Sequence, residues 1–166
     1  MNRHQFIKRA TAGGIIFSTM PLAAMQKQEE PQLDKKVVQE FVGQSHRDLT
    51  RVKELLVEYP TLLNAAHDWR YGDFETGLGA ASHVGNIAIV EYLLEKGAQA
   101  NIFTACVLGK TDIVKAMLTA FPSTLHAKGP HGFTLLHHAE KGGEAAFEIK
   151  DYLKSLGASE TKVSLY

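Results

Sequence analysis

Three stretches of the chain repeat one helical pattern, and this repetition constrains the fold more than any single residue. Each stretch has an alanine four residues before a glycine: Ala81 and Gly85, Ala105 and Gly109, Ala139 and Gly143. The first two glycines are followed at the same offset by Ile-Val and then by a hydrophobic pair. The third stretch follows this pattern only in part, with Ile149 and then Tyr152-Leu153. Self-similarity over a few tens of residues is typical of stacked repeat proteins. The sequence therefore predicts a row of helical units that bury one another.

Capping residues and apolar spacing predict four helix pairs, and hence an all-α fold. The first pair begins at two good capping residues, Asp34 and Asp48, each followed by an apolar stripe at helical spacing. The later helices are expected at residues 76–84 and 87–96, 102–108 and 111–121, and 134–141 and 145–156.

The spacing between equivalent positions is uneven. Gly85 and Gly109 are 24 residues apart, whereas Gly109 and Gly143 are 34 residues apart. The connector that precedes the second and fourth units is nearly absent before the third. We therefore expect one shortened junction, with a notch between two connectors that is walled by Trp69 and His131.

Two segments resemble the ankyrin repeat. Residues 132–139 read Gly-Phe-Thr-Leu-Leu-His-His-Ala, similar to the signature Gly-x-Thr-Pro-Leu-His-x-Ala, with Leu135 in place of proline. Residues 85–101 match the second half of that repeat. The resemblance covers residues 36–158, and residues 69–85 with 129–132 are most similar to a small group of bacterial ankyrin-repeat proteins. It implies an ankyrin-repeat solenoid of about four helix-turn-helix units, one junction being shortened. Solenoids generally present a surface and not a reaction centre, which favours a protein-binding role.

The same resemblance gives several residues a structural role. An imidazole at the position of His137 normally bonds the backbone of an adjacent connector, and threonine at a helix start caps backbone donors. The residues expected to serve the repeat in this way are Thr76, Gly85, Gly109, Thr134, His137 and Gly143. The second unit departs from the signature, because Gly77 and Gly79 stand where proline and histidine are usual.

Helical register predicts which side chains a partner would contact. Parallel stacking should align the exposed positions of the inner helices, and aromatic connector residues beside polar ones are what binding hot spots use. The predicted partner-binding residues are Trp69, Tyr71, Phe74, His83, Thr104, Val107, His131, His138 and Lys141. A second interpretation of Trp69 is that it folds over Gly77 and Gly79 and fills the space of their missing side chains. We expect a monomeric scaffold for an unidentified protein, not an enzyme.

The sequence predicts no catalytic, metal or cofactor site. It has no nucleophile elbow, phosphate loop or dinucleotide-binding pattern. Acidic and imidazole side chains occur near the connectors, but their spacing matches no known ligand pattern: Asp68, Asp73, Glu75, His83, His131 and His138. For Asp73, closing the turn at Gly72 is a simpler role. The alternative function is a small-ligand receptor or metal-dependent enzyme that uses the notch near Trp69 and His131.

The first residues have the layout of an export signal. Residues 1–24 combine a basic head, a short apolar run and small residues, and the head resembles a twin-arginine motif in which His4 replaces the second arginine. Residues 25–33 read as a polar linker and residues 34–166 as the ankyrin-repeat domain. The apolar run is too short to cross a membrane, so we expect no stable membrane span in the mature chain. An exported protein, periplasmic or extracellular, is expected, and a cytoplasmic regulator is the alternative.

The charge and the cysteine content argue against a nucleic-acid-binding protein and against a fold held by disulfides or cysteine-bound zinc. The chain has 18 Lys and Arg, of which three precede residue 25, leaving 15 against 18 Asp and Glu. A slightly acidic domain without basic blocks is a poor nucleic-acid binder. The single cysteine, Cys106, excludes an intrachain disulfide and a cysteine-based zinc site.

Overall fold

The computed structural model describes residues 32–166, and Leu33–Tyr166 form one compact unit. The expected export signal, residues 1–24, and most of the expected linker lie outside the described residues. The described part is mostly helical and contains one two-stranded sheet. None of the helices within residues 32–166 has both the length and the apolar character that a membrane crossing requires.

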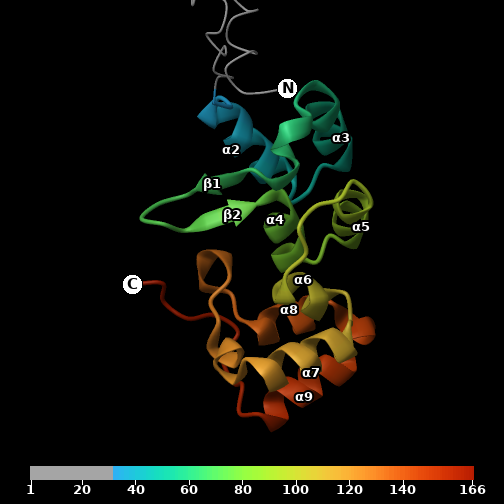
Figure 1. Ribbon diagram of the computed structural model, residues 1–166, viewed down its shortest axis with the longest axis vertical. Coiled ribbons are helices and arrows are strands. Elements are labelled where there is room, and N and C mark those ends of the chain that lie inside the picture. The colour runs from blue at the N-terminus through green and yellow to red at the C-terminus, as the bar shows by residue number, and fades with distance from the viewer. Residues whose placement is uncertain (1–31) are drawn as a thin grey trace, which may run out of the picture. The chain divides into compact units, whose positions relative to one another are not determined.

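The α-helices of the described part follow one another in four packed pairs (Figure 1). The pairs are α2 (Lys35–Gln44) with α3 (Leu49–Glu58), α4 (Gly77–Val84) with α5 (Ile87–Glu95), α6 (Ile102–Val107) with α7 (Thr111–Ala120), and α8 (Leu135–Lys141) with α9 (Phe147–Ser155). Short 3-10 turns lie between them: η2 (Pro60–Asn64), η3 (Pro122–His126), η4 (Pro130–Gly132) and η5 (Gly143–Ala146). The helices from α4 onward lie within two residues of their predicted ends.

Side-chain caps begin most of these helices. The capping oxygen belongs to Asp34 in α2, Asp48 in α3, Thr76 in α4, Asn86 in α5, Asn101 in α6 and Thr134 in α8. Each accepts a hydrogen bond from a backbone N–H of the first turn, which has no partner inside the helix. Each of these helix starts therefore depends on a capping residue adjacent to it in the sequence, which explains why the starts could be predicted.

The core has two parts that meet at α4 and α6. Residues from α2 to α5 form the first part, including Phe41 and Leu93, and residues from α6 to α9 form the second, including Ile149. Cys106 lies in the second part, where burial raises the pKa of its thiol to about 12 and so keeps it protonated. The packing continues across both parts because α4 contacts α2, α6 and α8.

Glycines let the ends of the central helices approach one another closely. Gly85 has a φ of 75°, and a Cβ atom there would lie 2.8 Å from the carbonyl oxygen of Lys141. At Gly109, with a φ of 66°, a Cβ atom would overlap the carbonyl group of Ala145. Both positions need glycine for its backbone conformation and for its missing side chain. Because α6 has only six residues, α4 and α8 also contact each other directly.

A β-hairpin replaces the connector that was expected before α4. Strand β1 (Ala66–Asp68) pairs antiparallel with β2 (Phe74–Thr76), and Figure 1 shows the hairpin extending away from the helices. The all-α prediction agrees with most of the described residues, and this two-stranded hairpin is the exception to it. Asp68 Oδ1 accepts a hydrogen bond from the backbone N–H of Gly72 at 3.1 Å. The side chain that closes this turn is therefore that of Asp68, while Asp73 contributes through its backbone: its N–H donates to the carbonyl of Arg70 at 3.0 Å and its carbonyl accepts from the N–H of Trp69 at 3.1 Å.

We expect Gly77→Ala to destabilise the protein by about 1–3 kcal/mol through overpacking. A Cβ atom at Gly77 would lie 2.6 Å from Phe41 Cε1 and 2.8 Å from Ser45 Oγ. Gly43→Ala is the matched control, because it also lies in a helix but has no atom of the described residues within 4 Å of the new Cβ. The control should stabilise by about 0.5–1 kcal/mol through helix propensity. Urea unfolding of the two variants measures the difference, and equal effects would contradict the packing argument.

Candidate functional site

The inner side of the hairpin carries a buried carboxylate. Glu75 lies in β2, and its side chain is fully shielded from solvent. Trp69 Nε1 donates a hydrogen bond to Glu75 Oε2 at 2.7 Å. A buried charge is costly unless charged or hydrogen-bonding groups surround it. The neighbours of Glu75 therefore decide what this site is.

Three imidazoles from separate elements surround Glu75. His46 follows the end of α2, His83 lies in α4 and His131 lies in η4. His83 Nε2 is 2.9 Å from Glu75 Oε1, while His46 Nε2 and His131 Nε2 are 3.6 and 3.5 Å from Glu75 Oε2. His46 Nε2 also lies 3.1 Å from His83 Nε2. Four donor atoms thus lie within 4.8 Å of one another, close enough for one cation to bridge them.

The outer nitrogens of two rings are held by groups that can only accept hydrogen bonds. His46 Nδ1 lies 3.0 Å from the carbonyl oxygen of Val42 and 3.2 Å from that of Gly43. His131 Nδ1 lies 2.7 Å from Asp73 Oδ2. Both Nδ1 atoms must therefore carry the proton. In a neutral imidazole the remaining nitrogen, Nε2, then directs a lone pair into the cluster.

Asp73 also fixes the backbone of His131. Its Oδ1 accepts a hydrogen bond from the His131 backbone N–H at 2.8 Å. His131 has a φ of 59°, in the left-handed region that residues other than glycine rarely adopt. Such a conformation persists only where its surroundings hold it, and it is common at functional sites. A single carboxylate thus positions both the backbone and the ring of His131.

Both carboxylates of the site stay ionised in spite of their burial. Burial by itself raises the pKa of Glu75, but the close contact with His83, the hydrogen bond from Trp69 and the electrostatic effect of His46 hold it below its usual value. Burial likewise raises the pKa of Asp73, and the two hydrogen bonds from His131 bring it below its usual value. The site therefore holds two negative charges beside three imidazoles.

The nine predicted partner-binding residues lie in very different surroundings. Tyr71, Phe74 and Lys141 are exposed, and Trp69 and His131 are half-buried. Four others are buried: His83, Thr104, Val107 and His138. The expected exposure of these four is wrong, because α4, α6 and α8 pack against one another and the positions counted as outward meet a neighbouring helix. Thr104 Oγ1, for example, lies 3.2 Å from Ser82 Oγ across the α4–α6 contact.

The expected notch is not open between Trp69 and His131. Their ring centroids are 6.1 Å apart, and both rings reach Glu75. Trp69 also does not fill the space at Gly77 or Gly79. The atoms nearest to a Cβ at Gly77 belong to Phe41 and Ser45, and those nearest to a Cβ at Gly79 belong to Thr76, Pro130 and Glu75.

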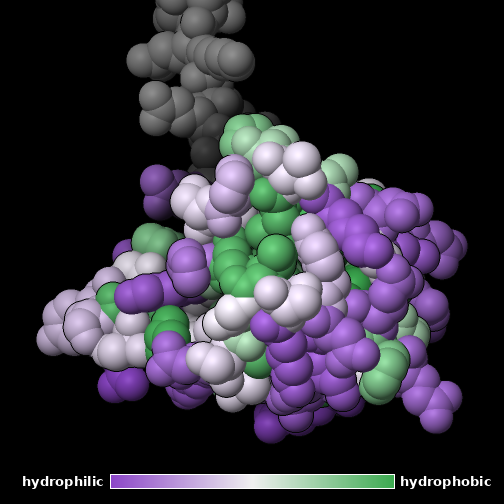
Figure 2. Space-filling view, turned by 90° about the horizontal axis from the view of Figure 1, so that it is seen from below, coloured by the Kyte–Doolittle hydropathy of each residue, from purple (hydrophilic) through white to green (hydrophobic). Residues whose placement is uncertain are grey.

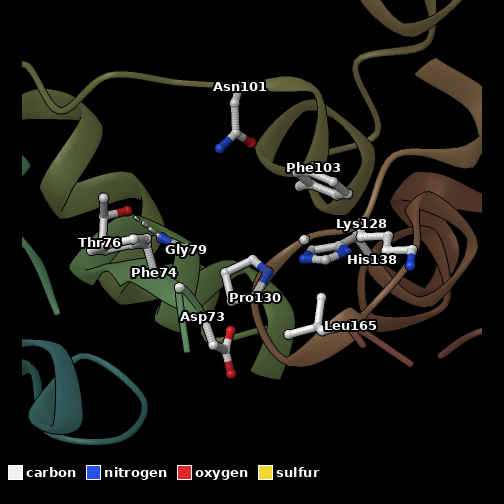
Figure 3. Close-up of a pocket in the computed structure, with 12 residues that line it drawn as sticks. Asp73, Phe74, Thr76, Gly79, Asn101, Phe103, Lys128, Pro130, His138 and Leu165 are labelled. Carbon is white, nitrogen blue, oxygen red and sulfur yellow. Dashed lines mark hydrogen bonds between the residues drawn. The ribbon is translucent and has the colours of Figure 1, made fainter. Parts of the chain in front are cut away.

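A pocket of about 240 Å³ lies beside this cluster, with Asp73 in its wall (Figure 3). Asn101 and Phe103 line it from the start of α6, and His138 lines it from α8. His138 Nδ1 donates to the carbonyl oxygen of Thr134 at 2.7 Å, and its Nε2 has no hydrogen-bond partner within residues 32–166. Burial lowers the pKa of His138 to about 4, and the nearby His137 and His83 act in the same direction.

Three members of the cluster are among the candidate residues of the sequence (Glu75, His83 and His131), whereas His46 is not. The available signal was weak: repeat register places His46 one position beyond the residue equivalent to His83 in the preceding unit. His46 and His83 are 37 residues apart, a separation that matches no known metal-ligand pattern.

Comparison with known proteins does not identify the chain. No protein-family model matches it, and a search of curated proteins gave no match.

We expect His138 to lower the stability of the protein as the pH falls. Its pKa is near 6.5 in an unfolded chain and about 4 in the folded protein, so the unfolded chain binds more protons between these values. The stability is fully present above pH 6.5 and is lost as the pH falls toward 4, by about 2 kcal/mol between pH 7 and 5.

Urea unfolding at these two pH values measures the loss, with His138→Asn as the control. Asparagine keeps a side-chain N–H for the carbonyl of Thr134 but does not titrate, so the variant should lose about 2 kcal/mol less. The same loss in both proteins would contradict the assignment to His138.

Proposed function

We propose that the chain is an ankyrin-type solenoid of about four helix-turn-helix units that serves as a scaffold for a partner protein, with no catalytic role. The observation that carries the proposal is the recurrence of one local design. Capping side chains stand at equivalent helix starts in three units, Thr76, Asn101 and Thr134. Left-handed glycines end the first helix of two units, Gly85 and Gly109. Repeats of this kind present extended surfaces to other proteins.

His137 supports the repeat interpretation. Its Nε2 lies 2.8 Å from the backbone carbonyl oxygen of His83 in α4. The resemblance implies an imidazole bonded to backbone at this position, although to a connector and not to a helix. The direct contact between α4 and α8 is a second departure from a regular stack, and the shortness of α6 accounts for it.

The hairpin tip is the surface that best fits a protein partner. Tyr71 is 90% exposed and Phe74 is 62% exposed, and the ring of Tyr71 meets that of Tyr166 edge-on at a centroid distance of 6.1 Å. Exposed aromatic side chains do little for folding but are frequent anchors in interfaces. Since Glu75 in β2 contacts His83 of α4 and Asp73 in the turn bonds His131 of η4, the hairpin is held in place before a partner arrives.

A second group of exposed apolar residues lies in and beside α7 and α9, at the lower end of the described unit in Figure 1. Ile113 and Phe121 belong to α7 and its end, and Phe147 begins α9. Figure 2, which views the molecule from that side, shows a mostly hydrophilic face around a central hydrophobic patch. These residues provide a matched control for the hairpin.

Export of the scaffold is proposed on the sequence of residues 1–24 alone.

We expect Tyr71→Ser combined with Phe74→Ser to weaken partner binding at least tenfold, because aromatic anchors contribute about 1–3 kcal/mol each to an interface. Quantitative affinity purification of the full chain from its native host would compare it with this variant and with Ile113→Ser combined with Phe121→Ser. The control should capture the same partners as the unmodified chain. Partners lost equally with both variants, or with neither, would contradict the hairpin as the binding surface.

A further inference from the structure

We propose that His46, Glu75, His83 and His131 form a binding site for one divalent transition-metal ion, with zinc the expected occupant. The site lies beneath the hairpin and would exist whether or not the hairpin tip binds a protein. It goes beyond the scaffold role, since a metal ion would join the hairpin to helices on both sides of it.

The distances between the donor atoms fit coordination of a single ion. Around zinc, nitrogen and oxygen ligands lie at about 2.0–2.1 Å, so two ligands of a tetrahedron are about 3.3 Å apart. His83 Nε2 lies 2.9 Å from Glu75 Oε1, and His131 Nε2 and His46 Nε2 lie 3.5 and 3.6 Å from Glu75 Oε2. The imidazole nitrogens of His46 and His83 are 3.1 Å apart. All four donors already lie within 4.8 Å of one another, so only small movements are needed to close the shell.

The hydrogen bonds on the outer nitrogens of His46 and His131 leave their Nε2 atoms facing the centre of the cluster. His46 and His131 each carry a proton on the outer nitrogen, which is bonded to carbonyl oxygens or to Asp73. Their Nε2 atoms, His83 Nε2 and the Glu75 carboxylate lie within one small region. A divalent cation there would bind all four of these groups at once.

One oxygen of the cluster, Glu75 Oε1, lacks a hydrogen-bond partner within residues 32–166, and this is a second and independent indication of a ligand. Glu75 Oε1 is buried and makes no hydrogen bond of acceptable geometry within residues 32–166, although His83 Nε2 lies only 2.9 Å away. The contact is close but is not directed along an N–H bond. A buried carboxylate oxygen without such a bond is costly. A metal ion between this oxygen and the imidazole nitrogen would remove that cost.

The outer hydrogen bonds are those that metal-binding histidines usually make. Such a ligand commonly donates its second N–H to a carboxylate or a backbone carbonyl, which fixes the ring and its tautomer. His131 has the carboxylate partner, Asp73, and His46 has backbone carbonyl partners. The ring of His83 is stacked on Phe133 at a centroid distance of 5.0 Å, which fixes its plane.

The donor set selects the class of metal. Three imidazoles and one carboxylate suit zinc and neighbouring transition metals, whereas magnesium and calcium prefer shells made of oxygen atoms. Zinc with four protein ligands is the arrangement of structural sites. The ion would join residues as far apart as His46 and His131, which are 85 positions apart in the sequence. Its expected role is therefore to fix the hairpin and η4 against α2 and α4.

The experiment measures metal binding by the full chain after treatment with a chelator. We expect one equivalent of Zn²⁺ to bind with a Kd of about 1 μM or lower in calorimetry, and to raise the Tm as binding to the folded state requires. Co²⁺ should give a visible absorption spectrum that Zn²⁺ abolishes. Absence of stoichiometric binding would overturn the proposal and would leave the scaffold role unaffected, since that role depends on the hairpin tip.

Matched variants separate this site from adventitious binding. His46→Gln and His131→Asn should weaken Zn²⁺ binding at least 100-fold and abolish the Tm increase. Their side chains are 24% and 27% exposed, and asparagine tolerates the left-handed backbone at position 131, so both variants should fold. His126→Gln, which removes an exposed histidine outside the cluster, should bind as the unmodified chain does. Equal affinity of all three variants would overturn the proposal, and circular dichroism would confirm that each is folded.

Asp73→Asn tests the outer hydrogen bond. Because Asp73 touches His131 and not the ion, its loss should weaken Zn²⁺ binding about 10–100-fold while keeping the stoichiometry at one. The Co²⁺ spectrum should keep its general form, since the four ligands are unchanged. An unchanged affinity in a folded Asp73→Asn protein would contradict the positioning role of Asp73.

Discussion

The buried carboxylate of Glu75 determines how the hairpin meets the helices. A shielded negative charge is tolerated only where donors or cations surround it, and here these come from Trp69 within the hairpin and from His46, His83 and His131 outside it. The end of α2, α4 and η4 must therefore lie together around β2. The same requirement explains why Trp69 turns inward to Glu75 while the aromatic residues at the hairpin tip remain exposed.

Close approach of the central helices is the second constraint. Gly85 and Gly109 have no side chains to separate their backbones from those of Lys141 and Ala145. The helices α4, α6 and α8 consequently pack tightly enough to bury positions that a more open stack would expose. Because α4 belongs to this central group and also carries His83, the helix packing sets the position of one imidazole of the cluster.

The helices could be predicted from the sequence because their signals are local: a capping residue such as Thr134 and an apolar stripe lie within one turn of each other. The hairpin was missed because its aromatic residues were interpreted as a binding connector, and the strands are only three residues long. His46 was missed because it meets Glu75, His83 and His131 only through tertiary packing. Burial of Thr104 and Val107 could not be predicted either, since it depends on how closely neighbouring units approach.

The left-handed backbone of His131 links these observations. Glycine or asparagine would adopt this conformation more readily, so histidine at this position needs a compensating interaction. Asp73 supplies two hydrogen bonds, one to the backbone and one to the ring, and both direct Nε2 toward Glu75. A purely structural turn would require only the backbone bond. The second bond controls the direction of an imidazole lone pair, and this is better explained by a ligand in the cluster than by the needs of the turn.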